Sequence, residues 1–187
     1  FRHLAAAGIR PIGKKQRDNA FVQVINYFRQ NRSEMDRIIE TEVDVSVEKE
    51  QYILTGKIDL LLGRDEKLEL LDFKSQPRPE KDDARLECYY RQLCIYAHIL
   101  ERRYGKRPER LFLYWTGEPL RKDALMEFPY KPEIVEEAGT YFDSVVARIL
   151  KRDYQIKKPP EKKICKECDI RPYCGREGVI VIKESEE

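Results

Sequence analysis

Residues 51–74, QYILTGKIDLLLGRDEKLELLDFK, contain two stretches rich in strand-forming residues with a polar, glycine-containing connection between them. The two stretches are 51–62 and 68–74, and the connection 63–67 is typical of a hairpin. Folding the chain symmetrically about Asp65 and Glu66 places Gly63 beside Leu68 and continues the same register beyond them. The sequence therefore predicts that Asp59 and Asp72 are cross-strand neighbours.

Two carboxylates on neighbouring strands repel each other unless something compensates the charge. A hard divalent cation with oxygen ligands is the usual compensation. Because side chains alternate between the faces of a strand, Lys74 is expected on the same face as Asp72, with Leu71 and Phe73 pointing into the core. We therefore predict a metal site at the acidic pair, Asp59 and Asp72, with Lys74 able to reach whatever the metal binds.

An ordinary surface hairpin is the alternative interpretation of the same residues. Surface hairpins often carry aspartate and lysine, and a register shift of one residue would move the two carboxylates to opposite faces. The hairpin alone therefore leaves both interpretations open, and the other motifs in the chain must decide.

Length and charge set the class of protein. The 187 residues suit one domain with a small appendage and are enough to bury a substantial core. Thirty-six basic residues against 34 acidic ones give a net charge of +2, so the total charge does not indicate a nucleic-acid partner. Any such binding must come from the local arrangement of charge.

Targeting signals are not evident in the sequence. There is no apolar run of the roughly 18 residues that a membrane span needs and no charged-then-apolar leader. We expect a cytoplasmic protein that has no membrane partner. The chain begins with Phe1 rather than Met, which suggests a fragment of a longer protein.

The remaining periodicities predict three helices and three further strands. The helices are 17–31, 83–103 and 132–151, and the strands are 43–47, 111–116 and 124–128. The first helix is expected to pack on the core through Phe21, Val24, Ile25 and Phe28. Helix, strands, helix, strands and helix in this order predict an α/β fold with a central mixed sheet flanked by helices.

One face of the helix 83–103 carries polar groups that could serve a site. Gln92 and Tyr96 are four residues apart and share a face, with Arg85 two turns earlier on roughly the same side. Such a face could bind a phosphate backbone or a metal-bound water. An ordinary polar helix face is the alternative.

Three cysteines with short spacings lie near the C-terminus. Cys165-x2-Cys168-x5-Cys174 lets one loop wrap a soft metal, either zinc or an iron–sulfur cluster. Both normally take four ligands, and only three are in this segment. We expect a core over residues 1–155 and a Pro/Lys-rich link with a cysteine-rich metal staple over 156–187. The link is either a solvated tether or a contact to phosphates.

Together these motifs resemble the PD-(D/E)XK nuclease superfamily, and within it the RecB-like branch that has a C-terminal iron–sulfur staple. The resemblance implies a restriction-endonuclease-like core. The matching motifs, in chain order, are Gly56-x2-Asp59, Asp72-x-Lys74, Gln92-x3-Tyr96 and the cysteine triplet.

The resemblance also implies a role for each matching residue. Asp59 and Asp72 would bind Mg²⁺ or Mn²⁺, and Lys74 would position or activate the attacking water. Gln92 and Tyr96 would support the site and the nucleic-acid strand. The branch commonly has a metal-binding histidine in an N-terminal helix, for which His3 is the candidate here.

For the cysteines, the resemblance implies a 4Fe–4S cluster whose fourth cysteine lies N-terminal to the nuclease core. No cysteine precedes Cys88 in this chain, so that ligand would lie before Phe1. A zinc ion is the alternative occupant of Cys165, Cys168 and Cys174.

The function that these motifs favour is a metal-dependent DNA nuclease, an exonuclease on single-stranded DNA. Its expected setting is the C-terminal module of a UvrD-like helicase-nuclease in DNA repair or recombination, with a helicase motor as its partner. A free-standing CRISPR-associated nuclease that trims DNA before spacer integration resembles the same motifs. A catalytically silent DNA-binding or docking module is a third hypothesis.

Overall fold

The computed structural model describes residues 13–64 and 67–153. Contacts divide the chain into two compact units, residues 1–144 and 145–187, and the first contains the whole sheet. In chain order the elements are α2 (Lys14–Asn31), the 3₁₀ helix η1 (Arg32–Arg37), β1 (Ile38–Glu48), β2 (Ile53–Arg64), β3 (Lys67–Lys74), α3 (Ala84–Tyr104), β4 (Pro108–Trp115), α4 (Arg121–Ala124), β5 (Leu125–Pro129) and α5 (Pro132–Leu150).

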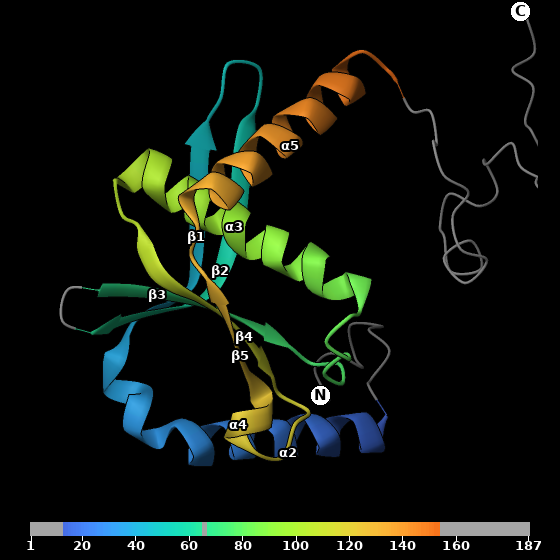
Figure 1. Cartoon of the computed structure of the whole chain (residues 1–187). Helices are drawn as coiled ribbons and strands as arrows, with labels where there is room; N and C mark the ends of the chain where they lie inside the picture. Colours follow the sequence, from blue (N-terminus) through green and yellow to red (C-terminus); the bar gives the residue numbers. More distant parts are fainter. Residues whose placement is uncertain (1–12, 65–66, 154–187) are drawn as a thin grey trace, which may run out of the picture. The chain divides into compact units, whose positions relative to one another are not determined.

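The five strands form one mixed sheet in the order β1-β2-β3-β4-β5 (Figure 1). Strands β3 and β4 are parallel, and every other neighbouring pair is antiparallel. The parallel pair is joined through α3, as a parallel connection requires a crossover. The predicted α/β fold with a mixed sheet flanked by helices is confirmed, and it is consistent with a restriction-endonuclease-like core.

The predicted hairpin register is confirmed. Strand β2 pairs with β3 so that Gly63 lies opposite Leu68, and the ladder continues as far as Leu60 opposite Leu71. Asp59 and Asp72 follow immediately after this last pair. The acidic pair therefore lies at the end of the hairpin ladder, where the two strands begin to separate.

Strand β2 is irregular at Asp59. Ile58 and Leu61 pack in the same core cluster although they are three residues apart, so the strict alternation of faces is broken between them. On β1, Glu42 has a positive φ of 53°, and it lies between the pairs that flank Asp59. Figure 1 shows β2 changing direction between its two halves. The bend places Asp59 where β2 separates from β3 while it stays paired with β1.

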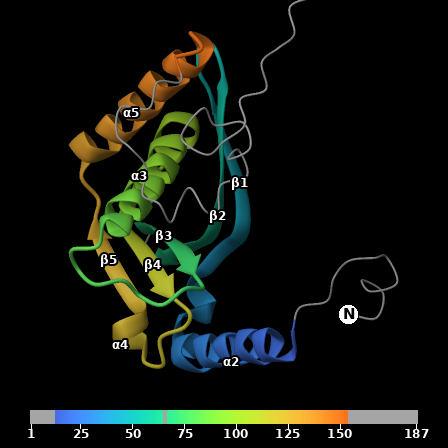
Figure 2. The same cartoon turned by 90° about the vertical axis from the view of Figure 1, so that its right-hand side faces the viewer.

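Helices cover both faces of the sheet. Figure 2 shows α2 on one side and α3 with the start of α5 on the other. The larger core lies beneath α3 and includes Leu70, whereas the smaller cluster on the α2 side includes Leu71 and Phe73. Leu71 and Phe73 therefore point into the smaller core, and Asp72 faces the larger one. The site is covered by α3 instead of lying on an open hairpin.

The structure corrects the predicted orientation of α2. Phe21 and Val24 are about two-thirds exposed and Phe28 is 51% exposed, so these three members of the predicted stripe do not pack on the sheet, whereas Ile25 is partly buried. The face toward the sheet carries Tyr27, whose ring packs edge to face on Phe73 and Tyr114, and Asn31, whose Nδ2 donates to the Tyr114 hydroxyl at 2.9 Å. Helix α2 therefore contacts the sheet through an aromatic ring and the hydrogen bonds of Asn31, a face that the predicted apolar stripe did not indicate.

A buried histidine joins α3 to α5 and to the β1–β2 turn. His98 is 3% exposed, and its ring lies so close to Gly139 that a Cβ there would be 2.7 Å from it. Lys49 Nζ is 3.1 Å from His98 Nε2. Because an ammonium can only donate, Nε2 accepts and the ring is neutral. Burial first, and then the positive charge of Lys49, lower the pKa of His98 below 6.5.

We predict that this histidine makes the fold less stable in acid. A base whose pKa is lowered by folding binds fewer protons in the folded state. The contribution of His98 to stability is therefore fully present above pH 6.5 and is lost as the pH drops below that value. The free energy of unfolding, measured with urea at about pH 7.5 and about pH 5.5, should fall more between these two pH values for the wild type than for His98→Gln. Equal losses in the two proteins would contradict the assignment. The charged groups that also face His98 are Glu136, Arg102 and Asp143.

Candidate active site beneath helix α3

The structure brings five predicted site residues together: Asp72, Lys74, Gln92 and Tyr96 are linked by hydrogen bonds and an ion pair, and Asp59 is bonded to the backbone of Phe73 between Asp72 and Lys74. Asp59 comes from β2, Asp72 and Lys74 come from β3, and Gln92 and Tyr96 come from α3. The two parts of the group come from segments separated by the loop 75–83. Tertiary packing of α3 on the sheet therefore assembles this group.

Asp59 is fastened to the neighbouring strand through its carboxylate. Asp59 Oδ2 accepts a hydrogen bond of 2.7 Å from the backbone N–H of Phe73. This contact crosses from β2 to β3 just beyond the last paired residues of the ladder. It keeps the two members of the acidic pair adjacent where the regular strand pairing has ended.

Asp72 is the buried member of the acidic pair. Its side chain is 5% exposed, and Oδ2 lies 2.6 Å from Lys74 Nζ in an ion pair. Oδ2 accepts no well-aligned hydrogen bond, whereas Oδ1 accepts one of 3.2 Å from Gln92 Nε2. Burial raises the pKa of Asp72, Lys74 opposes that rise, and Asp59 adds to it. One carboxylate oxygen is therefore held only by charge.

Lys74 occupies the centre of the group. Besides the ion pair, Nζ donates to Gln92 Oε1 at 2.9 Å, and its side chain is 13% exposed. Nζ also lies 4.5 Å from the centre of the Tyr89 ring, within the range of a cation–π contact. The ammonium is thus surrounded by a carboxylate, an amide oxygen and an aromatic face.

Gln92 links Lys74 and Asp72 because both the oxygen and the nitrogen of its side-chain amide form hydrogen bonds. The oxygen accepts from Lys74, and the nitrogen donates to Asp72 and, at 2.8 Å, to the Tyr96 hydroxyl. The Tyr96 ring fits because residue 56 is glycine: a Cβ on Gly56 would lie 2.8 Å from Tyr96 Cε1. The glycine of the Gly56-x2-Asp59 motif thus makes room for α3.

Arg85 does not join this group, contrary to the expectation from helical periodicity. Asp83 is the N-cap of α3, and its carboxylate accepts from both the backbone and the guanidinium of Arg85. The side chain of Arg85 is exposed and is held at the helix terminus. Capping of the helix competes successfully for this arginine.

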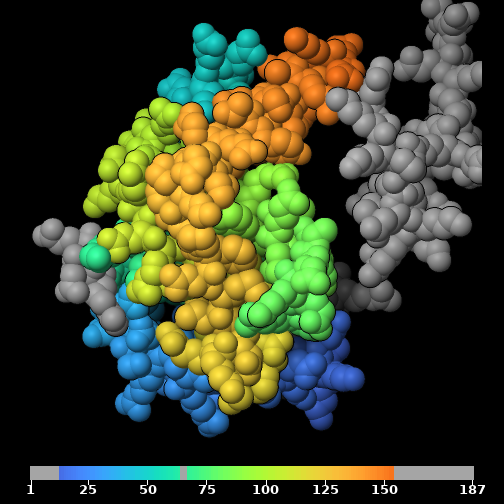
Figure 3. Space-filling view, viewed as in Figure 1, coloured from blue at the N-terminus to red at the C-terminus, as the bar shows by residue number. Residues whose placement is uncertain are grey.

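Sequence reasoning missed Tyr89 and Gln76. Tyr89 lies one turn before Gln92 on the same face of α3, and its hydroxyl accepts a hydrogen bond from Gln76 Nε2. The spacing of three from Gln92 was the available signal. Figure 3 shows the first turns of α3 at the molecular surface, and Gln76 and Tyr89 are both partly exposed.

The group suits a hard cation. Within residues 13–64 and 67–153 no cluster of three or more His, Cys, Asp or Glu side chains could hold a metal. The acidic pair offers two carboxylates, one of which has a buried oxygen without a well-aligned hydrogen bond. Mg²⁺ commonly takes one or two carboxylates and completes its coordination with water and substrate phosphate oxygens. The donor set therefore fits Mg²⁺ or Mn²⁺.

The other predicted ligands lie outside the described residues. They are His3, Cys165, Cys168 and Cys174. The predicted division between residues 155 and 156 also remains a prediction. In the described part of the chain no helix is long and apolar enough to cross a membrane.

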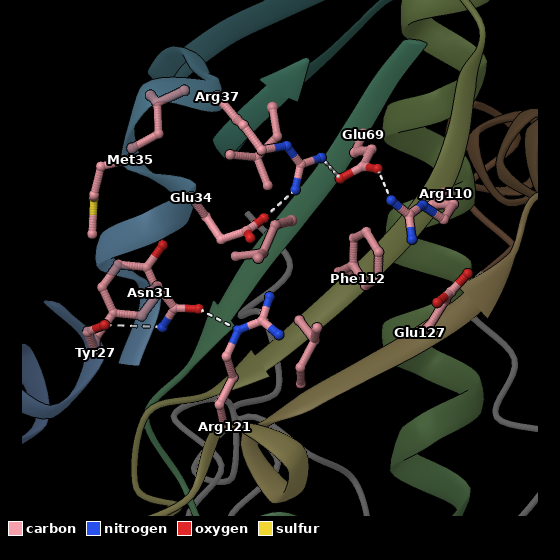
Figure 4. Close-up of a pocket in the computed structure, with 14 residues that line it drawn as sticks. Tyr27, Asn31, Glu34, Met35, Arg37, Glu69, Arg110, Phe112, Arg121 and Glu127 are labelled. Atoms are coloured by element: carbon pink, nitrogen blue, oxygen red, sulfur yellow. Dashed lines mark hydrogen bonds and ion pairs between the residues drawn. The ribbon is translucent and has the colours of Figure 1, made fainter. Parts of the chain in front are cut away.

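A separate cavity of about 270 Å³ lies on the opposite, α2 side of the sheet (Figure 4). Glu69, whose side chain is 4% exposed, accepts hydrogen bonds there from Arg37 on η1 and Arg110 on β4. Arg37 also donates to Glu34. None of the five predicted site residues lines this cavity. The ion pairs join η1 to the sheet, which is a structural role.

We predict that removing the central carboxylate of this network strongly destabilises the fold. Glu69→Ala would leave Arg37, whose side chain is 12% exposed, without a charge partner on the sheet. The free energy of unfolding should fall by about 3–5 kcal/mol, as measured by urea denaturation. Glu109→Ala removes an exposed partner of Lys67 and should cost less than about 1 kcal/mol. Similar losses in the two variants would contradict this account.

Two solved structures are similar to this chain at low sequence identity. The crystal structure of SSO0001 is 15% identical, with a TM-score of 0.47, and the match covers 93% of this chain and 76% of that one. A protein from Eubacterium rectale described as a candidate exonuclease is 13% identical, also with a TM-score of 0.47, over 79% of this chain and 64% of that one. None of the curated proteins compared matches significantly.

A family comparison gives the decisive result. The sequence model of the PD-(D/E)XK nuclease superfamily matches residues 5–175, which is most of the chain and includes the acidic pair, Lys74, Gln92 and Tyr96. The observed mixed sheet and flanking helices agree with that assignment. This chain belongs to the PD-(D/E)XK nuclease superfamily.

Proposed function

We propose that this protein is a metal-dependent deoxyribonuclease that hydrolyses phosphodiester bonds at Asp59, Asp72 and Lys74. The observation that carries the proposal is the convergence of two carboxylates and one ammonium, with Lys74 Nζ 2.6 Å from Asp72. The acidic pair is held together by the contact of Asp59 with the Phe73 backbone. Membership of the superfamily supports this assignment of the site.

Asp59 and Asp72 would hold Mg²⁺ or Mn²⁺, the ions that this superfamily typically uses. A bound divalent ion supplies a nucleophilic water at neutral pH and relieves negative charge on the phosphoryl oxygens. The buried oxygen of Asp72 suits this role because it accepts no well-aligned hydrogen bond and is held by the charge of Lys74, with which a cation would compete. The low exposure of Asp72 also limits the water that would weaken such an interaction.

Lys74 would act on the substrate directly. Its ammonium can donate to a phosphoryl oxygen or to the attacking water, and its charge opposes the negative charge that develops during hydrolysis. Gln92 holds Lys74 and Asp72 in a fixed relation, and Tyr96 fixes the orientation of the Gln92 amide. Among the described residues no histidine contacts Asp72 as a general base, so we assign orientation of the water to Lys74.

For the substrate and setting, we propose an exonuclease on single-stranded DNA within a RecB-like helicase-nuclease that acts in DNA repair or recombination. The order of the motifs along the chain supports this proposal. A cytoplasmic location and a helicase motor as partner belong to the same proposal. The free-standing CRISPR-associated nuclease remains the second candidate because it resembles the same motifs. Survival of Asp59, Asp72 and Lys74 in one group argues against a catalytically silent module.

We also propose that Cys165, Cys168 and Cys174 bind a 4Fe–4S cluster, with zinc as the alternative, and that His3 is a further metal ligand. The short spacings of the thiols support the cluster. The domain boundary at residues 155 and 156 belongs to this proposal, since it separates the nuclease core from the cysteine segment.

The nuclease proposal predicts metal-dependent degradation of labelled single-stranded DNA by the purified protein. Asp72→Asn and Lys74→Ala should each lower the rate by about a hundredfold or more, because each removes a charge at the reacting phosphate. Lys67→Ala is the matched control, since Lys67 is exposed and pairs with Glu109. Degradation that continues unchanged in Asp72→Asn and Lys74→Ala would show that this group is not the catalyst.

Substrate form tests the finer proposal in the same assay. An exonuclease should degrade linear single strands and leave circular single strands intact. Cleavage of circles at a comparable rate would assign endonuclease action to the same site.

The cysteine proposal predicts a brown protein with absorbance from the near ultraviolet into the visible after anaerobic purification. Iron should be present, and Cys168→Ser should lose both the iron and the colour because a thiolate ligand is gone. A colourless protein that contains zinc would instead assign the alternative metal, and a protein without either metal would contradict both.

A further inference from the structure

Tyr89 lies against Lys74 without taking part in the hydrogen bonds that join Asp72, Lys74, Gln92 and Tyr96. The ammonium of Lys74 is 4.5 Å from the centre of the Tyr89 ring. The other two contacts of Lys74 are polar, with Asp72 and Gln92. The lysine is therefore held from one side by an aromatic face and from the others by oxygen atoms.

The Tyr89 ring is itself fixed on two sides. Its ring packs edge to face on Trp115, with 5.7 Å between the ring centres, and Trp115 is completely buried. Its hydroxyl accepts a hydrogen bond from Gln76, in the segment that follows β3. The ring therefore joins α3 to β4 and to the segment that follows β3, and it cannot turn away without disturbing the core.

Metal binding at the acidic pair would change what holds Lys74. The ammonium and a cation would compete for the same carboxylate, because Asp72 Oδ2 is the atom that Lys74 approaches at 2.6 Å. Once that oxygen serves a metal, the attraction between Asp72 and Lys74 is weaker. The Gln92 carbonyl and the Tyr89 ring remain, and neither is a metal ligand of the site as proposed.

We propose that Tyr89 is a positioning residue whose ring face keeps the Lys74 ammonium directed at the reacting phosphate when Asp72 is engaged by the metal. This inference rests on the proposed nuclease function and extends it to a residue outside the matched motifs. The π face carries the effect, since attraction between a cation and an aromatic ring comes from the ring. The hydroxyl serves only to anchor the ring to Gln76.

The contact can be tested without any assay of activity. Protons above an aromatic ring resonate upfield, so the ε-methylene of Lys74 should be shifted upfield in the NMR spectrum of ¹³C-lysine-labelled protein. Lys74→Ala assigns the signal by its loss. The upfield position should persist in Tyr89→Phe and after addition of Mg²⁺ to the wild type, and it should disappear in Tyr89→Leu. If the ε-methylene of Lys74 has the chemical shift of an ordinary exposed lysine in Mg²⁺-loaded wild-type protein, the proposal is overturned.

The consequence for catalysis can be tested by comparing two substitutions at the same position. Tyr89→Phe keeps the ring and should retain most of the cleavage rate at saturating DNA, whereas Tyr89→Leu should lower kcat about tenfold with little change in KM. Tyr104→Leu is the matched control, because Tyr104 is half exposed at the end of the same helix. Equal losses in Tyr89→Phe and Tyr89→Leu, or a loss confined to KM, would overturn the proposal.

The two tests separate failure of this inference from failure of the proposed function. Wild-type protein that cleaves no DNA with Mg²⁺ or Mn²⁺ would remove the nuclease proposal, and the NMR signal would still decide whether Tyr89 holds Lys74. An active wild type whose Tyr89→Leu variant cleaves at full rate would keep the nuclease and remove the role of Tyr89.

Discussion

The rest of the site depends on the ion pair between Asp72 and Lys74 on one face of β3. A carboxylate with 5% exposure needs a nearby positive charge, and the lysine two residues later supplies it at 2.6 Å. Gln92 then satisfies both members at once and ties them to α3. The same pair that makes the buried charge tolerable is the one that a metal would rearrange.

Burial of both faces of the sheet gives this pair its setting. Leu71 and Phe73 pack on the α2 side, so the residues between and after them, Asp72 and Lys74, face α3. The helix can approach closely because Gly56 leaves space for the Tyr96 ring. Side chains alternate between the two faces of β3, and a glycine on β2 leaves room for an aromatic ring of α3. These two features bring residues from β2, β3 and α3 into one group.

Particular residues show how far sequence reasoning reaches. The hairpin register, the sharing of one face by Gln92 and Tyr96, and the mixed sheet follow from local periodicity, and each is confirmed. The predicted inward face of α2 was wrong because the helix contacts the sheet through the Tyr27 ring and a hydrogen bond of Asn31. Arg85 was expected on roughly the same helix face as Gln92 and Tyr96, but the N-cap Asp83 holds it at the surface. Polar contacts of this kind leave no periodic signal.

The sequence by itself determined that β2 and β3 form a hairpin with Asp59 and Asp72 at its end. The alternation of side chains along a strand and the residue types of a turn depend on residues that are close in sequence, so they can be recognised from the sequence. Only the tertiary structure decided that Tyr89 lies beneath Lys74 and that the site is covered by α3. Those contacts join segments far apart in the chain, and the packing of a whole helix on a bent sheet sets their geometry.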